Sequence, residues 1–309
     1  MRRGTTALWA ATFLLLGGCK DKAADAPAAA QTPATASAPA SAASADASAA
    51  AQPAAAEVPA PGQVLADIYG TKGDGSASYA IDNGAVASFW YGYRFDLGGK
   101  QYYTGFANAT GGKYDKPGDP AGDQDLPDPA ATVSISQATY VLDSAGGKPA
   151  WTLFHAQRWA GDFGSDGKAD TLDEQRKPQS TETKDGHLLL ALPTTRFADG
   201  ITSAGFAVFT FDPNKNDLGD YKGWVYLGTV AAGEDNSAAC DDQGTMKCAT
   251  STGTLSFVPP ASGNVPSLRI ALQGTAVEGP GKVRTLGPAD TVTYTYDPAK
   301  QQYTPPLDR

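Results

Sequence analysis

The sequence predicts an all-β fold, an antiparallel sandwich or barrel built from successive hairpins after a disordered linker. Residues 268–272 and 292–296 alternate between apolar and polar side chains with period two, as half-buried strands do. The 35 Gly and 22 Pro of the chain suit many turns, and no convincing amphipathic helix follows Gly62. Shorter apolar or aromatic runs bounded by turn-forming residues occupy residues 187–192, 206–211 and 224–227.

The N-terminus has the features of an export signal. The basic pair Arg2-Arg3 precedes an apolar run from Ala7 to Leu16, which small residues follow. The run is too short to span a bilayer as a helix, because a span needs about 20 apolar residues. We therefore expect residues 1–18 to be a cleaved signal peptide.

The end of this signal, Leu16-Gly17-Gly18-Cys19, resembles the lipobox of bacterial lipoproteins. The resemblance implies that Cys19 carries lipid on its sulfur, becomes the new N-terminus and anchors the chain through acyl chains such as palmitate. Several acyl chains on one cysteine anchor a protein stably in the bilayer, since each buried CH₂ contributes about 0.8 kcal/mol. Lys20 directly after the cysteine favours, by the same resemblance, the periplasmic face of the outer membrane in a Gram-negative bacterium. The periplasmic face of the inner membrane is the alternative.

Residues 19–62 are expected to be the lipid-anchored cysteine and a disordered linker rich in Ala, Pro and Ser. Between Ala23 and Gly62 there are 21 Ala and 6 Pro, no aromatic residue, and one aliphatic side chain larger than Ala. Such a segment cannot bury enough apolar surface to offset the entropy lost on ordering. We expect a spacer that lets a folded domain work at some distance from the membrane.

Residues 63–309 form the predicted β domain and carry the acidic balance of the chain. The preceding residues contain equal numbers of basic and acidic side chains, so this domain holds the whole net charge of −9. That charge argues against nucleic acid and anionic lipid as partners, because both are polyanions. It is compatible with a basic protein partner.

A local pattern occurs four times in the domain: Asp at a strand end, then a turn, a Lys, and an aromatic residue that restarts the next strand. Asp suits the turn because its side chain bonds backbone N–H groups two residues on. Four ordinary hairpins account for the pattern; the alternative is a duplicated unit with halves at about 63–160 and 185–309. The Asp residues are Asp96, Asp143, Asp212 and Asp297.

Two cysteines, Cys240 and Cys248, remain beyond the predicted anchor. In an exported protein they are most simply a disulfide, because the periplasm is oxidising. The bridge would rigidify an acidic loop, residues 234–242, and so make it a contact surface.

No familiar catalytic motif is present. The two histidines, His155 and His187, lie in or beside predicted strands, where a lone histidine is usually structural. Hydrolysis of a glycan by a carboxylate pair stays open, because the two carboxylates need not be close in sequence. We expect a protein without enzymatic activity.

The segment from Asp162 to Asp173 partly resembles a calcium loop of the EF-hand kind. Such a loop places oxygen ligands at positions 1, 3, 5, 9 and 12 around a glycine at position 6. Here Gly167 holds position 6, and Gly164 replaces the ligand at position 3. Calcium is the only cofactor expected; the alternative is a solvated acidic turn. The candidate ligands are Asp162, Asp166, Asp170 and Asp173.

These observations predict an outer-membrane lipoprotein whose β domain binds a periplasmic protein, with an immunity or inhibitor protein as a specific version. One alternative is an envelope protein that binds or hydrolyses cell-wall glycan, with peptidoglycan as its partner and exposed aromatic residues stacked on sugar rings. Another is a structural component of envelope assembly. The aromatic candidates for glycan stacking are Trp90, Tyr91, Tyr93, Tyr102 and Tyr103.

Overall fold

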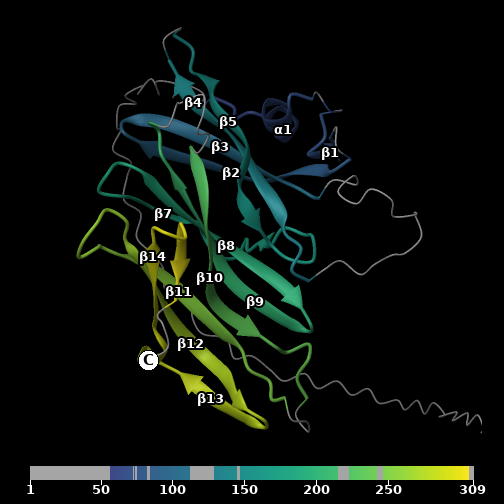
Figure 1. Ribbon diagram of the computed structural model, residues 1–309, viewed down its shortest axis with the longest axis vertical. Coiled ribbons are helices and arrows are strands. Elements are labelled where there is room, and N and C mark those ends of the chain that lie inside the picture. Colours follow the sequence, from purple (N-terminus) through teal and green to yellow (C-terminus); the bar gives the residue numbers. More distant parts are fainter. Residues whose placement is uncertain are drawn as a thin grey trace, which may run out of the picture. The chain divides into compact units, whose positions relative to one another are not determined.

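The computed structural model describes residues 56–71, 73, 75–81, 84–111, 129–144, 147–214, 223–241 and 246–305, all within one compact unit (Figure 1). The predicted signal peptide, Cys19 and most of the predicted linker lie outside these residues. The described chain is predominantly antiparallel β-sheet, so the predicted all-β fold class is confirmed.

The first sheet is a meander of five strands in chain order, β1 to β5. A two-residue turn joins β2 to β3, and both turn residues, Gly98 and Gly99, have positive φ. Glycine suits both places, because such a tight hairpin turn needs the left-handed region twice. The strands are β1 (Ser78–Ala80), β2 (Val86–Leu97), β3 (Lys100–Ala109), β4 (Val133–Asp143) and β5 (Ala150–Phe163).

The central sheet has the order β10-β9-β8-β6, with β7 also paired to β8. Its strand β8 contains the apolar run Leu188–Leu192, in which every residue is buried. Leu188 and Leu190 face a core shared with the first sheet, whereas Leu189 faces a core shared with the third. The run is continuous because both faces of this strand are covered. The strands are β6 (Thr171–Leu172), β7 (Gln179–Glu182), β8 (Leu188–Ala198), β9 (Ile201–Phe211) and β10 (Trp224–Asp235).

The third sheet has the order β11-β12-β14-β15, and β13 pairs with the far part of β12. All four Asp-containing patterns of the sequence fall on antiparallel pairs: β2 with β3, β4 with β5, β9 with β10, and β14 with β15. The duplication of halves stays a prediction. The elements are β11 (Ser251–Val258), β12 (Ser267–Gly279), β13 (Lys282–Leu286), the short 3₁₀ helix η1 (Pro288–Asp290), β14 (Val292–Asp297) and β15 (Gln302–Thr304).

A short helix, α1 (Pro61–Tyr69), covers the face of the first sheet that is turned away from the central sheet. The expectation that no amphipathic helix follows Gly62 is therefore wrong, and the predicted linker ends at the start of this helix. Val64, Leu65 and Ile68 lie on its buried face, with a spacing of one and three residues. A helix of about two turns is not stable alone, so packing on the sheet is what stabilises it.

A buried polar network joins the first sheet to the central one. The indole Nε1 of Trp224 donates to the hydroxyls of Thr104, at 3.1 Å, and Thr139, at 3.0 Å. The side-chain amide of Gln157 donates to the main-chain oxygen of Trp224 at 2.8 Å. Such a satisfied network fixes how the two sheets face each other, because any other arrangement would bury unpaired polar groups.

Candidate protein-binding surface

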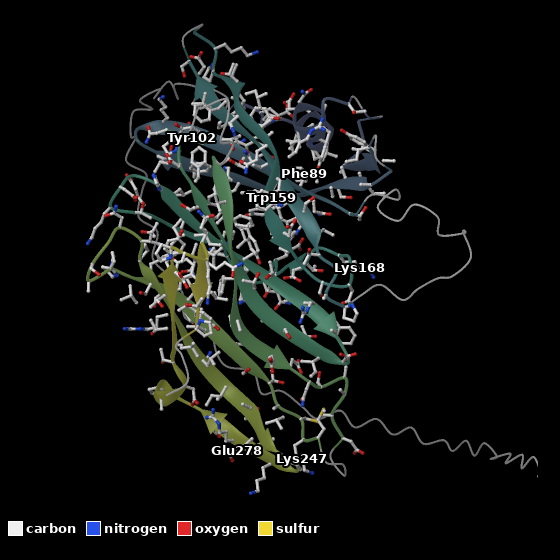
Figure 2. All side chains as sticks on the ribbon, viewed as in Figure 1. Phe89, Tyr102, Trp159, Lys168, Lys247 and Glu278 are labelled. Carbon is white, nitrogen blue, oxygen red and sulfur yellow. A yellow bond between two sulfur atoms is a disulfide. The ribbon has the colours of Figure 1, made fainter. Side chains whose placement is uncertain are left out.

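Four of the large apolar side chains that are exposed in the described part of the chain lie on three adjacent loops and hairpins. The exposed fraction is 65% for Phe197, 42% for Met246, 45% for Val277 and 38% for Val283. We call this region the tip surface and define it as residues 197–201, 236–241, 246–250 and 275–286. Figure 2 shows Lys247 and Glu278, from two of these segments, at the same end of the domain.

The first segment is the β8–β9 hairpin end. Asp199 and Gly200 form its two-residue turn, with φ of 52° and 78°. The Asp-Gly pair is a common choice for such a turn, because both residues tolerate positive φ. Phe197 is separated from the turn by Ala198 and is held in the strand by pairing with Thr202.

The second segment is the loop closed by the disulfide between Cys240 and Cys248, which confirms the predicted bridge. The buried side chain of Asn236 ties the two ends of the loop together. Its Nδ2 donates to the main-chain oxygen of Lys247 at 3.0 Å, and its Oδ1 accepts from the amide of Ala249 at 2.8 Å. These bonds fix Asn236 to the described end of the loop, at Lys247 and Ala249.

The third segment is the β12–β13 hairpin, in which Val277 and Val283 are directly paired. Paired residues of an antiparallel ladder point to the same face, so the two exposed side chains form one apolar spot. Charged residues surround this spot, and Arg284 is ion-paired with Asp290. The remaining charged residues of the hairpin are Glu278 and Lys282.

Direct contacts join the three segments into one surface. A Cβ atom placed on Gly200 would lie 2.6 Å from the Cβ of Ala239, so the first hairpin end packs on the disulfide loop. The amide of Thr275 donates to the main-chain oxygen of Thr250 at 2.8 Å, and the amide of Thr250 donates to the hydroxyl of Thr275 at 3.0 Å. The disulfide loop is therefore attached to both hairpins.

Acidic residues lie beside the disulfide bridge. Glu234 and Asp235 end β10, before the closed loop, and Asp241 lies inside the loop, which also contains the basic Lys247. The carboxylate of Asp235 accepts from the amide of Ser237 at 2.8 Å and from the hydroxyl of Thr250 at 3.3 Å. These bonds lower the pKa of Asp235, so its negative charge is fixed at neutral pH.

Sequence patterns did not identify the apolar residues of this surface. Val277 and Val283 carry no signal of exposure, since a half-buried strand has the same composition. Phe197 follows the charged Arg196 and lies two residues before the Asp199-Gly200 turn. This pattern could have predicted its place at a solvent-exposed hairpin end.

The four predicted calcium ligands are not gathered around one point. Asp162 ends β5 and accepts from the indole of Trp159, whereas Asp173 is paired with Arg176 at 2.6 Å. Asp166 lies in a turn with φ of 52°. No group of three or more His, Cys, Asp or Glu side chains in the described ranges is arranged to hold a metal ion. Of the four, only Asp162 and Asp170 line a common cavity, and calcium binding stays a prediction.

The histidines take part in local polar contacts. In β5, the Nδ1 atom of His155 accepts a hydrogen bond from the amide of Gln137 at 2.9 Å. His187 lies between two carboxylates, 3.7 Å from that of Asp185 and 3.4 Å from that of Asp212. These carboxylates face opposite nitrogens of the ring, so they orient it.

The aromatic residues that were candidates for glycan stacking belong to the cores. Tyr102 and Tyr103 are buried. Trp90, Tyr91 and Tyr93 pack against the core between the first and central sheets. They do not form an open stacking platform.

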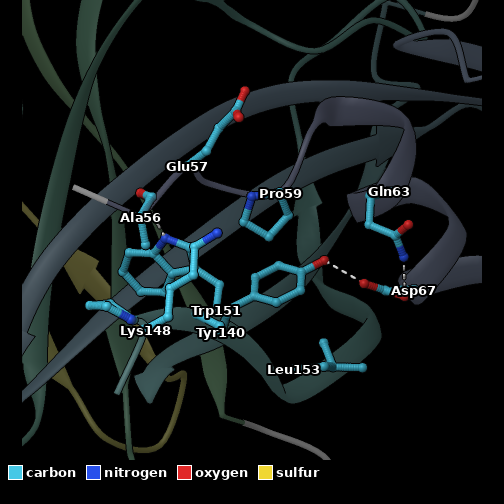
Figure 3. Close-up of a pocket in the computed structure, with 11 residues that line it drawn as sticks. Ala56, Glu57, Pro59, Gln63, Asp67, Tyr140, Lys148, Trp151 and Leu153 are labelled. Carbon is cyan, nitrogen blue, oxygen red and sulfur yellow. Dashed lines mark hydrogen bonds between the residues drawn. The ribbon is translucent and has the colours of Figure 1, made fainter. Parts of the chain in front are cut away.

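A separate cavity of about 540 Å³ lies where the chain enters the domain (Figure 3). The main-chain oxygen of Ala56 accepts from the indole of Trp151 and from the guanidinium of Arg94, each at 3.3 Å. The hydroxyl of Tyr140 donates to Asp67 at 2.6 Å. The polar groups around this cavity are therefore paired with one another. Their hydrogen bonds hold α1 and the residues before it against the first sheet.

No protein-family model, curated protein or solved structure matches this chain. Across the described residues, no helix is both long and apolar enough to cross a membrane.

Proposed function

We propose that the protein is a lipoprotein, anchored through Cys19 to the periplasmic face of the outer membrane, whose β domain binds another protein without catalysing a reaction. The observation that carries the protein-binding part is the tip surface, where exposed Phe197, Val277 and Val283 adjoin the loop closed by the disulfide and its acidic neighbours. Clustered exposed apolar side chains rimmed by polar residues mark interaction sites in soluble domains.

The anchor in this proposal rests on the lipobox-like Leu16-Gly17-Gly18-Cys19 alone. Metabolic labelling with palmitate tests it: the wild-type chain takes up label, and Cys19→Ser does not. Separation of the two membranes then tests the address. Label in the inner-membrane fraction would replace the outer-membrane assignment and leave the binding proposal intact.

The chemistry of the surface indicates the kind of partner. A partner with basic residues around an apolar pocket would complement the carboxylates of Glu234, Asp235 and Asp241 and accept Phe197 as an anchor. Charge complementarity speeds such an encounter, and a buried aromatic anchor contributes most of the binding energy. An immunity or inhibitor protein that blocks a toxin or lytic enzyme is the version we favour, because inhibitors need a rigid contact surface and no catalytic group.

Co-purification with matched variants tests the binding. The double variant Val277→Thr/Val283→Thr removes the apolar spot while keeping β-branched side chains, which strands favour. The control is Val86→Thr, at a similarly exposed position (40%) on the first sheet. A protein retained in stoichiometric amount by wild-type and Val86→Thr, but lost by the double variant, supports the proposal. Equal retention by all three proteins, or no stoichiometric protein with any, contradicts it.

A further inference from the structure

A second cavity, of about 460 Å³, lies on the face of the central sheet that is turned toward β5. Its floor comes from β8, β9 and β10, beyond the aromatic core, and its walls come from the end of β5 with the segment that follows and from β15. A volume of roughly 300–1,000 Å³ is typical of small-molecule sites. The polar and aromatic residues that line it include Asp162, Phe163, Asp170, Thr194, Thr195, Arg196, Ser203, Tyr226, Thr229 and Tyr303.

A β-bulge shapes the floor. The pairing of β10 with β9 shifts between Tyr226 and Thr229, and Gly228 inside the shift has φ of 96°. In a regular strand, residues three apart point to opposite faces, but a bulge inserts an extra residue and brings them to one face. The hydroxyls of Tyr226 and Thr229 are thereby hydrogen-bonded to each other at 2.7 Å.

The wall is fixed to the core by a defined contact. The indole of Trp90 donates to the main-chain oxygen of Asp170 at 3.1 Å, and the ring of Trp90 packs on Phe163. The carboxylate of Asp170 is half-buried, and Arg196 is the cation that acts on it. Burial raises the pKa of Asp170 because it disfavours the charged carboxylate, and the charge of Arg196 opposes this shift.

The lining selects one class of ligand. Two carboxylates accept hydrogen bonds, one guanidinium donates them, and seven hydroxyls can do both, although that of Tyr303 already donates to the main-chain oxygen of Pro266. An apolar ligand would cover Asp170 and Arg196 without adding a hydrogen bond to either, and an anion would face two carboxylates against one guanidinium. A simple cation would meet the carboxylates but be repelled by Arg196. A neutral ring with many hydroxyls uses donors and acceptors together and can stack on an aromatic side chain.

We propose that this cavity binds a saccharide ring, with the Asp170 carboxylate accepting sugar hydroxyls and Thr229 and Arg196 completing the contacts. The cavity shares no lining residue with the tip surface. The proposal therefore goes beyond protein binding and can fail or succeed independently of it.

The test titrates the full-length protein with N-acetylglucosamine, its β-1,4-linked dimer, glucose and maltose by isothermal titration calorimetry. At least one saccharide is expected to bind, and Asp170→Asn is expected to weaken that binding by at least roughly tenfold, the usual loss for a hydrogen bond to a charged group. The matched control is Asp166→Asn, four residues away and outside the cavity, which is expected to leave binding unchanged. Thr229→Val, at an exposed position, provides a second variant that keeps the side-chain shape.

Each other result overturns the proposal. If none of the four saccharides binds, the ligand class is wrong. If a saccharide binds but Asp170→Asn and Thr229→Val behave like Asp166→Asn, binding occurs elsewhere. If methylammonium binds more tightly than any saccharide, the cavity is a cation site. Urea unfolding of each variant shows whether a loss of binding reflects loss of the fold.

Discussion

Gly200 packs against Ala239 so closely that no side chain fits between them: a Cβ atom on residue 200 would stand 2.6 Å from the Cβ of Ala239. This contact connects the β8–β9 hairpin end, which carries Phe197, to the loop closed by the disulfide. The two segments are separated by about forty residues in the chain, yet they form one surface. The predictions below test this surface, its support and the core behind it.

Gly200→Ala is expected to lower the free energy of unfolding by about 2 kcal/mol, since positive φ and a steric clash act together. The matched control is Gly147→Ala: Gly147 has φ of 79°, close to the 78° of Gly200, but among the described residues no atom beyond its chain neighbours lies within 4 Å of the position that its new methyl group would take. Gly147→Ala should lower the free energy of unfolding by only about 1 kcal/mol, because positive φ is unfavourable for alanine but no clash is added. Urea unfolding of both variants measures the difference, and equal losses would show that the contact with Ala239 carries no energy.

Removal of the disulfide by Cys240→Ser/Cys248→Ser is expected to cost about 2.5 kcal/mol, because the bridge closes a short loop and restricts the unfolded chain. Binding of the protein partner should weaken as well, since the loop then loses freedom on binding. Denaturant midpoints with and without reductant measure the first effect. If the variant keeps both its stability and its retention of the partner, the disulfide has neither of these roles.

Acidification is expected to lower the free energy of unfolding partly because it protonates His155. Burial lowers the pKa of His155 in the folded protein below its ordinary value of 6.5. The unfolded chain then takes up a proton first, so the contribution is fully present above pH 6.5 and is lost as the pH falls from there toward the folded pKa. Protonation of Nδ1 would also remove the acceptor for Gln137, whose orientation is fixed by the hydroxyl of Thr139 donating to its oxygen.

The measurement is the free energy of unfolding of wild-type and His155→Asn between pH 8 and pH 5. The wild-type protein should lose stability more steeply, by at most about 1.4 kcal/mol per pH unit. His187→Asn serves as the control for histidine removal in general. Parallel pH curves for wild-type and His155→Asn would refute the assignment.

The sequence predicted the strands well where the physical signal is local. The run Leu188–Leu192 indicated a strand, and only the structure shows why it does not alternate: both faces are covered. The helix α1 was missed because two turns give a weak periodic signal and its stability comes from packing on the sheet. The disulfide followed from the count of cysteines and the expected compartment.

The candidate sites were harder to predict because they depend on contacts between distant segments. The acidic spacing from Asp162 to Asp173 suggested one calcium loop, but Asp173 turns to Arg176 and only Asp162 and Asp170 reach a common cavity. That cavity also needs Arg196 and the bulge beside Gly228, which no local pattern reveals. The tip surface likewise depends on the contact of Gly200 with Ala239.

The most direct test of the central claim is site-specific photocrosslinking in living cells, with a photoreactive amino acid at Phe197, at Val283 or at Val86. If the tip surface binds a protein, Phe197 and Val283 should each give the same discrete adduct of higher mass, and Val86, exposed on the first sheet, should not. The adduct should also disappear with Val277→Thr, which lies directly opposite Val283. Absence of a discrete adduct at Phe197 and Val283, or the same adduct at all three positions, would contradict the account.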